Sequence, residues 1–209
     1  QALVRKGVPA AAIAAIPNAV DGERFRHLGR TPSPHQRFLF IGRLVPEKNL
    51  DLLLRAFASV MRTHADVRLR LVGSGPLATP LQALAHSLGI AAHVEFTGHR
   101  DDIGVLLADA DFGVLPSRIE GLSNTLLEGL AAGLPMIATR VSGSEDVVRT
   151  GDNGWLCEPG NQAGLATCML DAIGLAPQAR AAMGLRARDS ATAHAGLGVV
   201  LERLMRLYR

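Results

Sequence analysis

The stretch that decides the fold runs from Arg37 to Gly73 and reads RFLFIGRLVPEKNLDLLLRAFASVMRTHADVRLRLVG. Its opening run, FLFIG, is typical of a short buried strand, and RLRLVG at its end is typical of a second strand. The segment NLDLLLRAFASVMRTH between them is predicted to be a helix. Short apolar strands that alternate with helices indicate a parallel sheet that helices cover on both faces.

The same alternation continues along the chain. Further strands are predicted at 93–98, 111–116, 136–139 and, as a candidate sixth, 154–159. Helical segments are predicted at 81–89, 100–110, 123–132 and 161–174. The tail is predicted to form two helices, of which the last, LGVVLERLMRLY, is amphipathic. The sequence therefore predicts an α/β fold with a Rossmann-like parallel sheet, helices on both faces and additional C-terminal helices.

The chain divides into three expected parts. Residues 1–36 are irregular and end in a linker that Pro32 and Pro34 bracket. Residues 37–192 carry the strand–helix alternation, and residues 193–209 form the last helix. Because the chain opens with Gln1 and shows no clean domain start, we expect it to be a fragment of a longer protein.

Composition bounds the function classes. The 209 residues are 48% hydrophobic and 20% charged, as in ordinary soluble domains. Aromatic residues make up only 4%, so we expect an aliphatic core and no base-stacking platform for single-stranded nucleic acid. From Pro177 onward six arginines face Asp189 and Glu202, a balance of +4. This tail is either a solvated helical surface or a contact for an anionic membrane or an acidic partner, and its charge is too weak to favour nucleic acid.

Two cysteines and the absence of targeting signals point to a compartment. Cys157 and Cys168 do not form a CxxC pair, and we expect both to be reduced and buried in a cytoplasmic protein. No run of eighteen apolar residues and no signal peptide is visible in the sequence.

Unusual residues follow the predicted strands. In parallel sheets ligands bind beyond the carboxyl ends of the strands, so these loops are expected to face one crevice. They are Gly42-Arg43, Gly73-Ser74-Gly75, Gly98-His99-Arg100, Ser117 to Glu120, and Ser142-Gly143-Ser144.

The segment PSRIEGLSNTLLEGLAAGLP, from Pro116 to Pro135, carries the chemistry of the predicted site. Glu120 and Glu128 stand eight positions apart, around a predicted helix start. Free N–H groups at a helix start suit a phosphate, and carboxylates accept hydrogen bonds from hydroxyl groups. On the helix, Glu128 is the only charged residue and lies opposite an apolar leucine face, which favours a functional placement over a solvated stripe. Together these features predict a sugar nucleotide as ligand.

Two further loops add candidate phosphate contacts. Arg43 and Lys48 flank a turn before the first helix and could clamp a diphosphate, the alternative being a pair of surface charges. Gly73 and Gly75 form a Gly-x-Gly turn that allows close backbone approach to a ligand, although tight turns need glycine as well. Because Ala78 replaces the third glycine of GxGxxG, a dinucleotide site is disfavoured.

Other polar clusters are weaker candidates for metal or catalytic sites. Asp109-Ala110-Asp111 is a DxD triplet, but it precedes the buried run FGVL and is interpreted as a helix-to-strand junction rather than a metal site. No histidine or cysteine cluster has metal-ligand spacing. His99 is a loop residue that is either a ligand contact or base, or a solvated side chain.

A family resemblance extends from about Ile16 to Ile173. The segments IPNAVDGERF, FIGRLVPEKNLDLLLRAF, LVGSGPL, EFTGHRDDI, PSRIEGLSNTLLEGLAAGLPMIAT, SGSEDVV and NGWLCEPGN occur in this order. Together they resemble the donor-binding half of a family 4 retaining glycosyltransferase. Such enzymes have the GT-B architecture, in which two Rossmann-like domains face each other across a cleft. Asn49 and Asn161 depart from the family, where glycine and aspartate are common.

The resemblance implies a role for each matched residue. Arg43 and Lys48 would bind the donor diphosphate, Glu120 the transferred sugar, and Glu128 the ribose hydroxyls. Arg100 and Asp101 would border the nucleobase. Arg43, Lys48 and Glu120 are the implied catalytic residues. The full implied donor-binding set is Gly42, Arg43, Lys48, Gly73, Gly75, Arg100, Asp101, Glu120, Gly121, Leu122, Ser123, Asn124, Thr125 and Glu128.

The resemblance also implies partners. The donor would be a nucleoside-diphosphate sugar, bound without metal or other cofactor. A glycan or lipid-linked acceptor would bind to an N-terminal domain missing from this chain, with residues 1–36 as the crossover from it. Alternatives are a sugar-nucleotide epimerase of the same architecture and a non-catalytic nucleotide-binding module. A dehydrogenase is least favoured.

Overall fold

A six-stranded parallel sheet forms the centre of the computed structural model, which describes residues 6–9, 13–14, 16–31, 33 and 35–208. The strands lie in the order β3-β2-β1-β4-β5-β6. Their bounds are β1 Gln36–Ile41, β2 Val67–Val72, β3 Val94–Gly98, β4 Phe112–Leu115, β5 Met136–Thr139 and β6 Gly154–Cys157. All neighbouring pairs are parallel, which confirms the predicted sheet and its candidate sixth strand.

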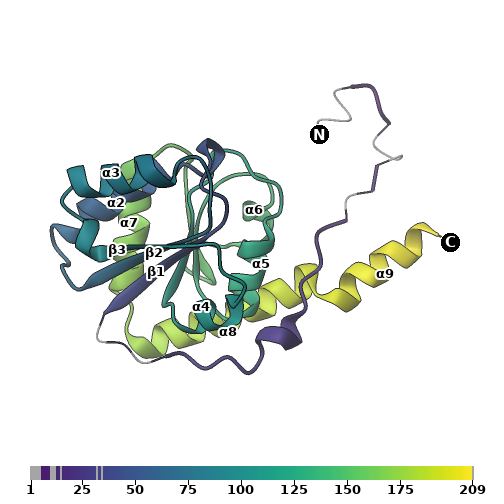
Figure 1. The fold of residues 1–209 in the computed structure, drawn as a ribbon. Coiled ribbons are helices and arrows are strands. Elements are labelled where there is room, and N and C mark those ends of the chain that lie inside the picture. The colour runs from purple at the N-terminus through teal and green to yellow at the C-terminus, as the bar shows by residue number, and fades with distance from the viewer. Residues whose placement is uncertain (1–5, 10–12, 15, 32, 34, 209) are drawn as a thin grey trace.

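Helices cover both faces of the sheet, as predicted (Figure 1). One layer holds α2 Leu50–Met61, α3 Ala78–Ser87 and α7 Gln162–Ile173. The other holds α4 Ile103–Ala108, α5 Asn124–Ala131, α6 Ser144–Val147 and α8 Pro177–Ala195. The described residues also form the 3₁₀ turns η2 Gly22–Phe25, η3 Pro46–Lys48 and η4 Ala91–His93. The last helix, α9 Leu197–Leu207, projects away from the sheet (Figure 1).

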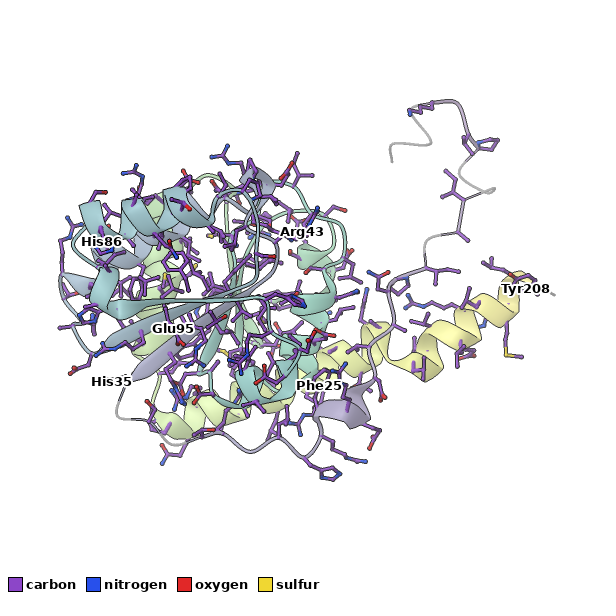
Figure 2. All side chains as sticks on the ribbon, viewed as in Figure 1. Phe25, His35, Arg43, His86, Glu95 and Tyr208 are labelled. Carbon is purple, nitrogen blue, oxygen red and sulfur yellow. The ribbon has the colours of Figure 1, made fainter. Side chains whose placement is uncertain are left out.

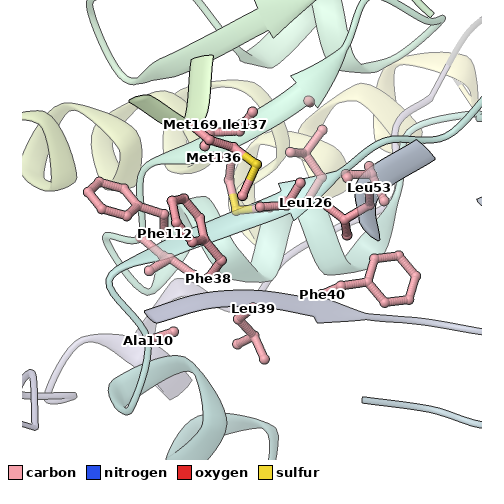
Figure 3. Close-up of a cluster of buried hydrophobic side chains, with 14 of the residues drawn as sticks. Phe38, Leu39, Phe40, Leu53, Ala110, Phe112, Leu126, Met136, Ile137 and Met169 are labelled. Carbon is pink, nitrogen blue, oxygen red and sulfur yellow. The ribbon is translucent and has the colours of Figure 1, made fainter. Parts of the chain in front are cut away.

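The core combines many aliphatic side chains with a few buried aromatic rings. Phe38 of β1 packs against Phe57 of α2 and Phe112 of β4, with ring centroids 6.4 and 5.5 Å apart. Phe112 in turn meets Trp155 of β6 at 6.1 Å. Figure 3 shows Phe38 on one side of β1 and Leu39 on the other, so both faces of the strand are packed. Most of the buried side chains are therefore aliphatic, as expected, and a row of aromatic rings runs across the sheet.

The first part of the chain packs on the same core. Val20 and Phe25 are buried, and the Val20 N–H donates to the Ala195 carbonyl at 2.8 Å. Arg30 donates to the carbonyls of Leu107 and Ala110 at 2.5 and 2.9 Å. Burial lowers the pKa of Arg30 to about 10. The expected linker 1–36 thus contributes core residues, while the flanking Pro32 and Pro34 lie outside the described residues.

Several predicted boundaries shift. The helix expected at 100–110 extends only over Ile103–Ala108, because the flanking Asp102 and Asp109 have non-helical backbones, with ψ of 50° and 16°. The tail forms two helices as predicted, but α8 extends to Ala195 and so crosses the expected boundary at residue 192. Cys157 and Cys168 are free and buried, as expected. Within the described residues, no helix is long and apolar enough to cross a bilayer.

Candidate functional site

The strand order reverses between β1 and β4, which are neighbours in the sheet. Loops that leave such a switch point diverge and form the usual ligand site of an open α/β sheet. Here the β1 loop and the β4 loop are in direct contact, since the Arg118 N–H donates to the Glu47 carbonyl at 2.8 Å. The β1 loop also bonds to the β2 loop, through Leu44 N–H and the Ser74 carbonyl at 2.9 Å. The structure thus brings the predicted loops to one end of the sheet.

Lys48 and Glu120 form an ion pair across the two loops. The Lys48 ammonium donates to Glu120 Oε2, and the two side chains are only 15% and 17% exposed. The Ser117 hydroxyl donates to the same carboxylate oxygen at 3.0 Å. Sequence reasoning placed Lys48 on the phosphates and Glu120 on the sugar. The structure adds that these two residues form an ion pair with each other.

Ser117 holds Glu120 from a fully buried position. Its side chain is 0% exposed, and its carbonyl accepts from the Thr139 hydroxyl at 2.6 Å. A buried hydroxyl that donates to a carboxylate fixes the carboxylate's orientation, because no water molecule competes for the hydroxyl's proton. Sequence reasoning included Ser117 in the loop but did not assign it a role, and it missed Thr139. A small polar residue directly after a buried strand was the only available signal.

Asn49 joins the same two loops on their outer side. It is 1% exposed and has a left-handed backbone, with φ of 54°. Its Oδ1 accepts from Arg118 Nε at 2.8 Å. Asparagine tolerates this conformation better than other residues with a Cβ, which explains how it replaces the family's usual glycine. Unlike glycine, it ties the loop of Lys48 to the loop of Glu120.

Arg43 differs from Lys48 in being exposed. It lies just after the end of β1 (Figure 2). Among the residues that the structure describes, it makes no ion pair. Its guanidinium is therefore available to a ligand. The predicted cation pair is thus one exposed arginine and one lysine already engaged with a carboxylate.

Gly73 and Gly75 allow two loops to pack closely. A Cβ on Gly73 would lie 1.9 Å from the Gly42 carbonyl oxygen, and one on Gly75 would lie 2.4 Å from the Leu44 carbonyl oxygen. Both contacts are shorter than any side chain permits. The Gly-x-Gly turn is therefore required by its packing against the β1 loop, and its close approach to a ligand stays a prediction.

The loop after β3 is paired within itself. Arg100 forms two bonds to Asp102, from Nε at 2.8 Å and from Nη2 at 2.5 Å. This hydrogen bonding raises the pKa of Arg100 and lowers the pKa of Asp102. His99 is 74% exposed and lies 3.2 Å from Asp101. No contact in the described residues joins the Arg100 or Asp101 side chain to Lys48 or Glu120.

The start of α5 lies within the β4 loop. Ser123 precedes the helix in extended conformation, and its side chain makes no capping bond, so the first-turn N–H groups of Asn124 and Thr125 are not satisfied by it. Gly121 is exposed, with open space where a side chain would stand. Gly143 of the β5 loop packs closely here, since a Cβ on it would lie 2.6 Å from the Gly121 carbonyl oxygen. The predicted helix 123–132 is confirmed, with Ser123 and Ala132 as its caps.

Glu128 projects from α5 toward the η2 segment. Its carboxyl is half-buried, and burial raises its pKa, an effect that Arg24 partly opposes. Together with Arg24, Phe25 and Asn124 it lines a pocket of about 180 Å³. The Asn18 amide donates to the Leu122 carbonyl at 3.1 Å and fixes this segment against the site. Sequence reasoning did not include Arg24, because nothing in its sequence context points to α5.

The DxD triplet lies where it was predicted, between α4 and β4. Asp109 pairs with Arg37 and Arg70, and Asp111 pairs with Arg37 and Arg180. These carboxylates therefore already have cationic partners. In the described part of the chain, no group of three or more His, Cys, Asp and Glu residues is arranged to hold a metal ion.

Comparison with known sequences assigns the family. The family model described as Glycosyl transferases group 1 matches residues 35–174. N-acetyl-alpha-D-glucosaminyl L-malate synthase of Bacillus anthracis is 37% identical over 143 residues, covering 68% of this chain. A GDP-mannose-dependent phosphatidylinositol monomannoside mannosyltransferase of Mycolicibacterium smegmatis is 32% identical over 203 residues, covering 86% of this chain. The chain spans 37% and 52% of the lengths of these two relatives.

Comparison with solved structures agrees on the fold. The Anabaena protein HepE, crystallised with UDP and glucose, superposes with a TM-score of 0.87 at 23% identity. The match covers 99% of this chain and 59% of HepE. The fold is thus the Rossmann-like fold of GT-B glycosyltransferases, and the chain belongs to the group 1 glycosyl transferases.

Proposed function

We propose that this chain binds the nucleotide-sugar donor of a retaining glycosyltransferase that moves a hexose from a nucleoside diphosphate to a hydroxyl acceptor. The observation that carries the proposal is the cluster of Lys48, Ser117 and Glu120 at the switch point of the sheet. The exposed Arg43 and the uncapped start of α5 lie on the same two loops. Together they offer cations and N–H groups to a diphosphate beside a carboxylate that accepts sugar hydroxyls.

Binding of the donor would rearrange the ion pair. The diphosphate draws Lys48 toward itself, and Glu120, still held by Ser117, is then free to accept from the transferred sugar. Arg43 and Lys48 stabilise the charge that develops on the leaving diphosphate. The bond from the sugar's anomeric carbon to the diphosphate breaks. The acceptor oxygen bonds to the same face of that carbon, and its proton passes to the leaving phosphate.

The ribose and base occupy neighbouring positions in this proposal. Glu128, half-buried and without a hydrogen-bonding partner in the described residues, accepts from the ribose hydroxyls. The β3 loop, with Arg100 and Asp101, borders the base. One relative is named for GDP-mannose and one structural neighbour was solved with UDP, so the base is left open in the proposal. No metal is needed, because Arg43 and Lys48 supply the charge that a cation would otherwise bring.

Calorimetry tests donor binding. The 209-residue chain is titrated with UDP, GDP and ADP in the presence of a chelator, and we expect one of them to bind. Binding that appears only with added magnesium or manganese would contradict the metal-free mode. Absence of binding for all three would contradict a donor site on this chain and favour a module without nucleotide function.

Substitutions of Glu120 and Glu128 test which part of the ligand each glutamate binds. Glu128→Gln is expected to weaken both the nucleoside diphosphate and its sugar conjugate. Glu120→Gln should spare the nucleoside diphosphate and lower turnover in the complete enzyme, because its charge acts on the reacting sugar. An epimerase would instead convert the donor alone, without acceptor, which assay of the complete enzyme reveals. The reverse pattern, with Glu120→Gln abolishing nucleotide binding, would overturn the assignment of roles.

We also propose where the acceptor binds and in which compartment the enzyme works. The acceptor, a glycan or a lipid-linked sugar, binds outside this chain on the other half of the enzyme, and the enzyme works in the cytoplasm. The last helix α9 exposes Leu201 and Met205, and the exposed Tyr208 follows it. These side chains lie beside Arg206, which pairs with Glu202, a pattern suited to an anionic membrane surface. Sedimentation with anionic vesicles tests this contact. Equal binding to neutral vesicles, or none to either, would remove it.

A further inference from the structure

Strand β2 has a polar face that is unusual for its place in the sheet. It reads VRLRLV, and its alternate residues Arg68 and Arg70 are only partly buried. The strand register places Arg68 beside Arg37 of β1, and Arg70 beside Glu95 of β3. Strands inside parallel sheets are normally apolar on both faces. Arginines on this face therefore require a specific explanation.

A cavity lies over this face at the amino ends of the strands. It has a volume of about 300 Å³, with Leu39 of β1 and Ala110 among its apolar walls. Figure 2 shows that His35 lies at one end of β1 and Arg43 at the other, so the cavity is remote from the donor loops. The polar residues that line it are His35, Arg37, Arg68, Arg70, His93, Glu95 and Asp109.

The three arginines of the cavity differ in their carboxylate partners. Arg37 and Arg70 share Asp109, and Arg70 also pairs with Glu95 at 2.6 Å. Arg37 also pairs with Asp111, which lies outside the lining, so Arg37 and Arg70 both have carboxylate partners. Arg68, by contrast, has no carboxylate within ion-pair distance among the described residues.

Arg68 is held in place by neutral groups. Its Nη1 donates to its neighbour Val67's carbonyl at 2.9 Å and lies 2.7 Å from His93 Nδ1. If Nδ1 accepts from Arg68, the proton of a neutral His93 is on Nε2 and is a further donor. One guanidinium nitrogen is engaged with the protein, and Nε and Nη2 make no protein bond in the described residues. The remaining N–H groups form the fork that binds an oxyanion in bidentate fashion.

We propose that this cavity is a second ligand site, separate from the donor site, that binds a small molecule carrying an oxyanion beside an apolar group. Arg68 binds the oxyanion, and the apolar group packs against Leu39 and Ala110. Phenyl phosphate has this chemistry and serves as the probe, with inorganic phosphate for comparison. Because the cavity has apolar walls, phenyl phosphate should bind more tightly than inorganic phosphate.

Amide NMR of the 209-residue chain tests the proposal, because it reports where a ligand binds. Titration with phenyl phosphate should shift amides of residues 35–39, 68–70 and 93–95 in a saturable manner. Arg68→Ala should weaken this binding about tenfold or more, as expected for the loss of a charged hydrogen-bonding partner. Arg62→Ala, the same change at an exposed arginine at the end of α2, should leave it unchanged.

Arg68→Lys keeps the proposal testable if the alanine variant does not fold. Lysine retains the charge but loses the fork, so binding should weaken while the fold, checked by thermal denaturation, is kept. Shifts confined to the donor loops, or equal affinity in the Arg68 and Arg62 variants, would overturn the proposal. Neither result bears on the proposed donor site, because calorimetry with nucleotides tests that site independently.

Discussion

Removing Lys48 should destabilise the protein, whereas removing Arg43 should not. Lys48 and Glu120 are 15% and 17% exposed, so Lys48→Ala leaves a largely buried carboxylate without its cation. Breaking a buried pair in this way costs about 3–5 kcal/mol. Because the Ser117 hydroxyl still donates to Glu120, we expect a loss of about 2–3 kcal/mol, or roughly 4–12 °C in melting temperature for a chain of this size.

Arg43→Ala is the matched comparison. Arg43 is exposed, and exposed substitutions usually change the free energy of unfolding by less than about 0.5 kcal/mol. Its loss should instead weaken a nucleoside diphosphate by about ten- to a hundredfold, and the corresponding nucleoside far less, because a charged hydrogen bond to phosphate is lost.

Urea denaturation and calorimetry on the same samples separate the two effects. The double variant Lys48→Ala/Glu120→Gln should recover part of the lost stability, because glutamine leaves no unpaired charge. Wild-type stability in Lys48→Ala would mean that the ion pair does not form in solution. Equal losses of stability for Arg43→Ala and Lys48→Ala would refute the reasoning that only one of these cations is engaged with the protein.

Three further changes follow from the backbone and burial of the site. Asn49→Ala should cost about 1–2 kcal/mol more in the free energy of unfolding than Asn49→Gly, because both lose the bond to Arg118 but only alanine is strained at φ of 54°. Gly73→Ala should prevent folding or lower the melting temperature sharply, since its Cβ would lie 1.9 Å from a backbone oxygen, while Gly89→Ala, with φ of 71° and open space around it, should cost only about 1 kcal/mol. Glu128→Gln should raise the free energy of unfolding at neutral pH, but not at a pH below the ordinary carboxyl pKa. The raised pKa of Glu128 in the folded protein stabilises the fold at low pH, and this stabilisation is lost as the pH rises through that pKa. Urea denaturation at about pH 7 and about pH 4 measures the difference, and equal stability of the two proteins at neutral pH would show that burial does not penalise this carboxylate.

The sheet could be predicted from sequence because its signal is local. Strands such as Phe112–Leu115 are buried along their whole length, and such apolar runs between helices have few other interpretations. The role of Phe25 could not be predicted in the same way. It is one apolar residue in a polar segment, so no periodicity shows that it packs in the core. The same holds for Arg30, whose partners are backbone carbonyls 77 and 80 residues away.

From the sequence, the types of residue in the site could be predicted, but not the contacts between them. Carboxylates and cations in loops after strands identified Glu120 and Lys48, but their contact spans 72 residues of sequence and depends on the sheet order. From sequence, Asn49 is a departure from the family pattern without consequence for the chemistry. Its bond to Arg118, across 69 residues, shows that the departure joins the two loops of the site. Such pairings become visible only when β1 and β4 are known to be neighbours.

Two polar residues of this site, Glu128 and Asn49, are in states that lower the stability of the fold. Glu128 loses solvation in a half-buried position, and no hydrogen bond from the described residues compensates it. Asn49 holds a left-handed backbone, and its buried amide nitrogen has no partner among the described residues. Groups in such states cluster where a protein must meet a ligand, because the ligand provides the missing partners. A ribose provides hydroxyl donors of the kind that Glu128 lacks. Under the proposed function, the half-buried Glu128 carboxylate would gain these donors from the ligand.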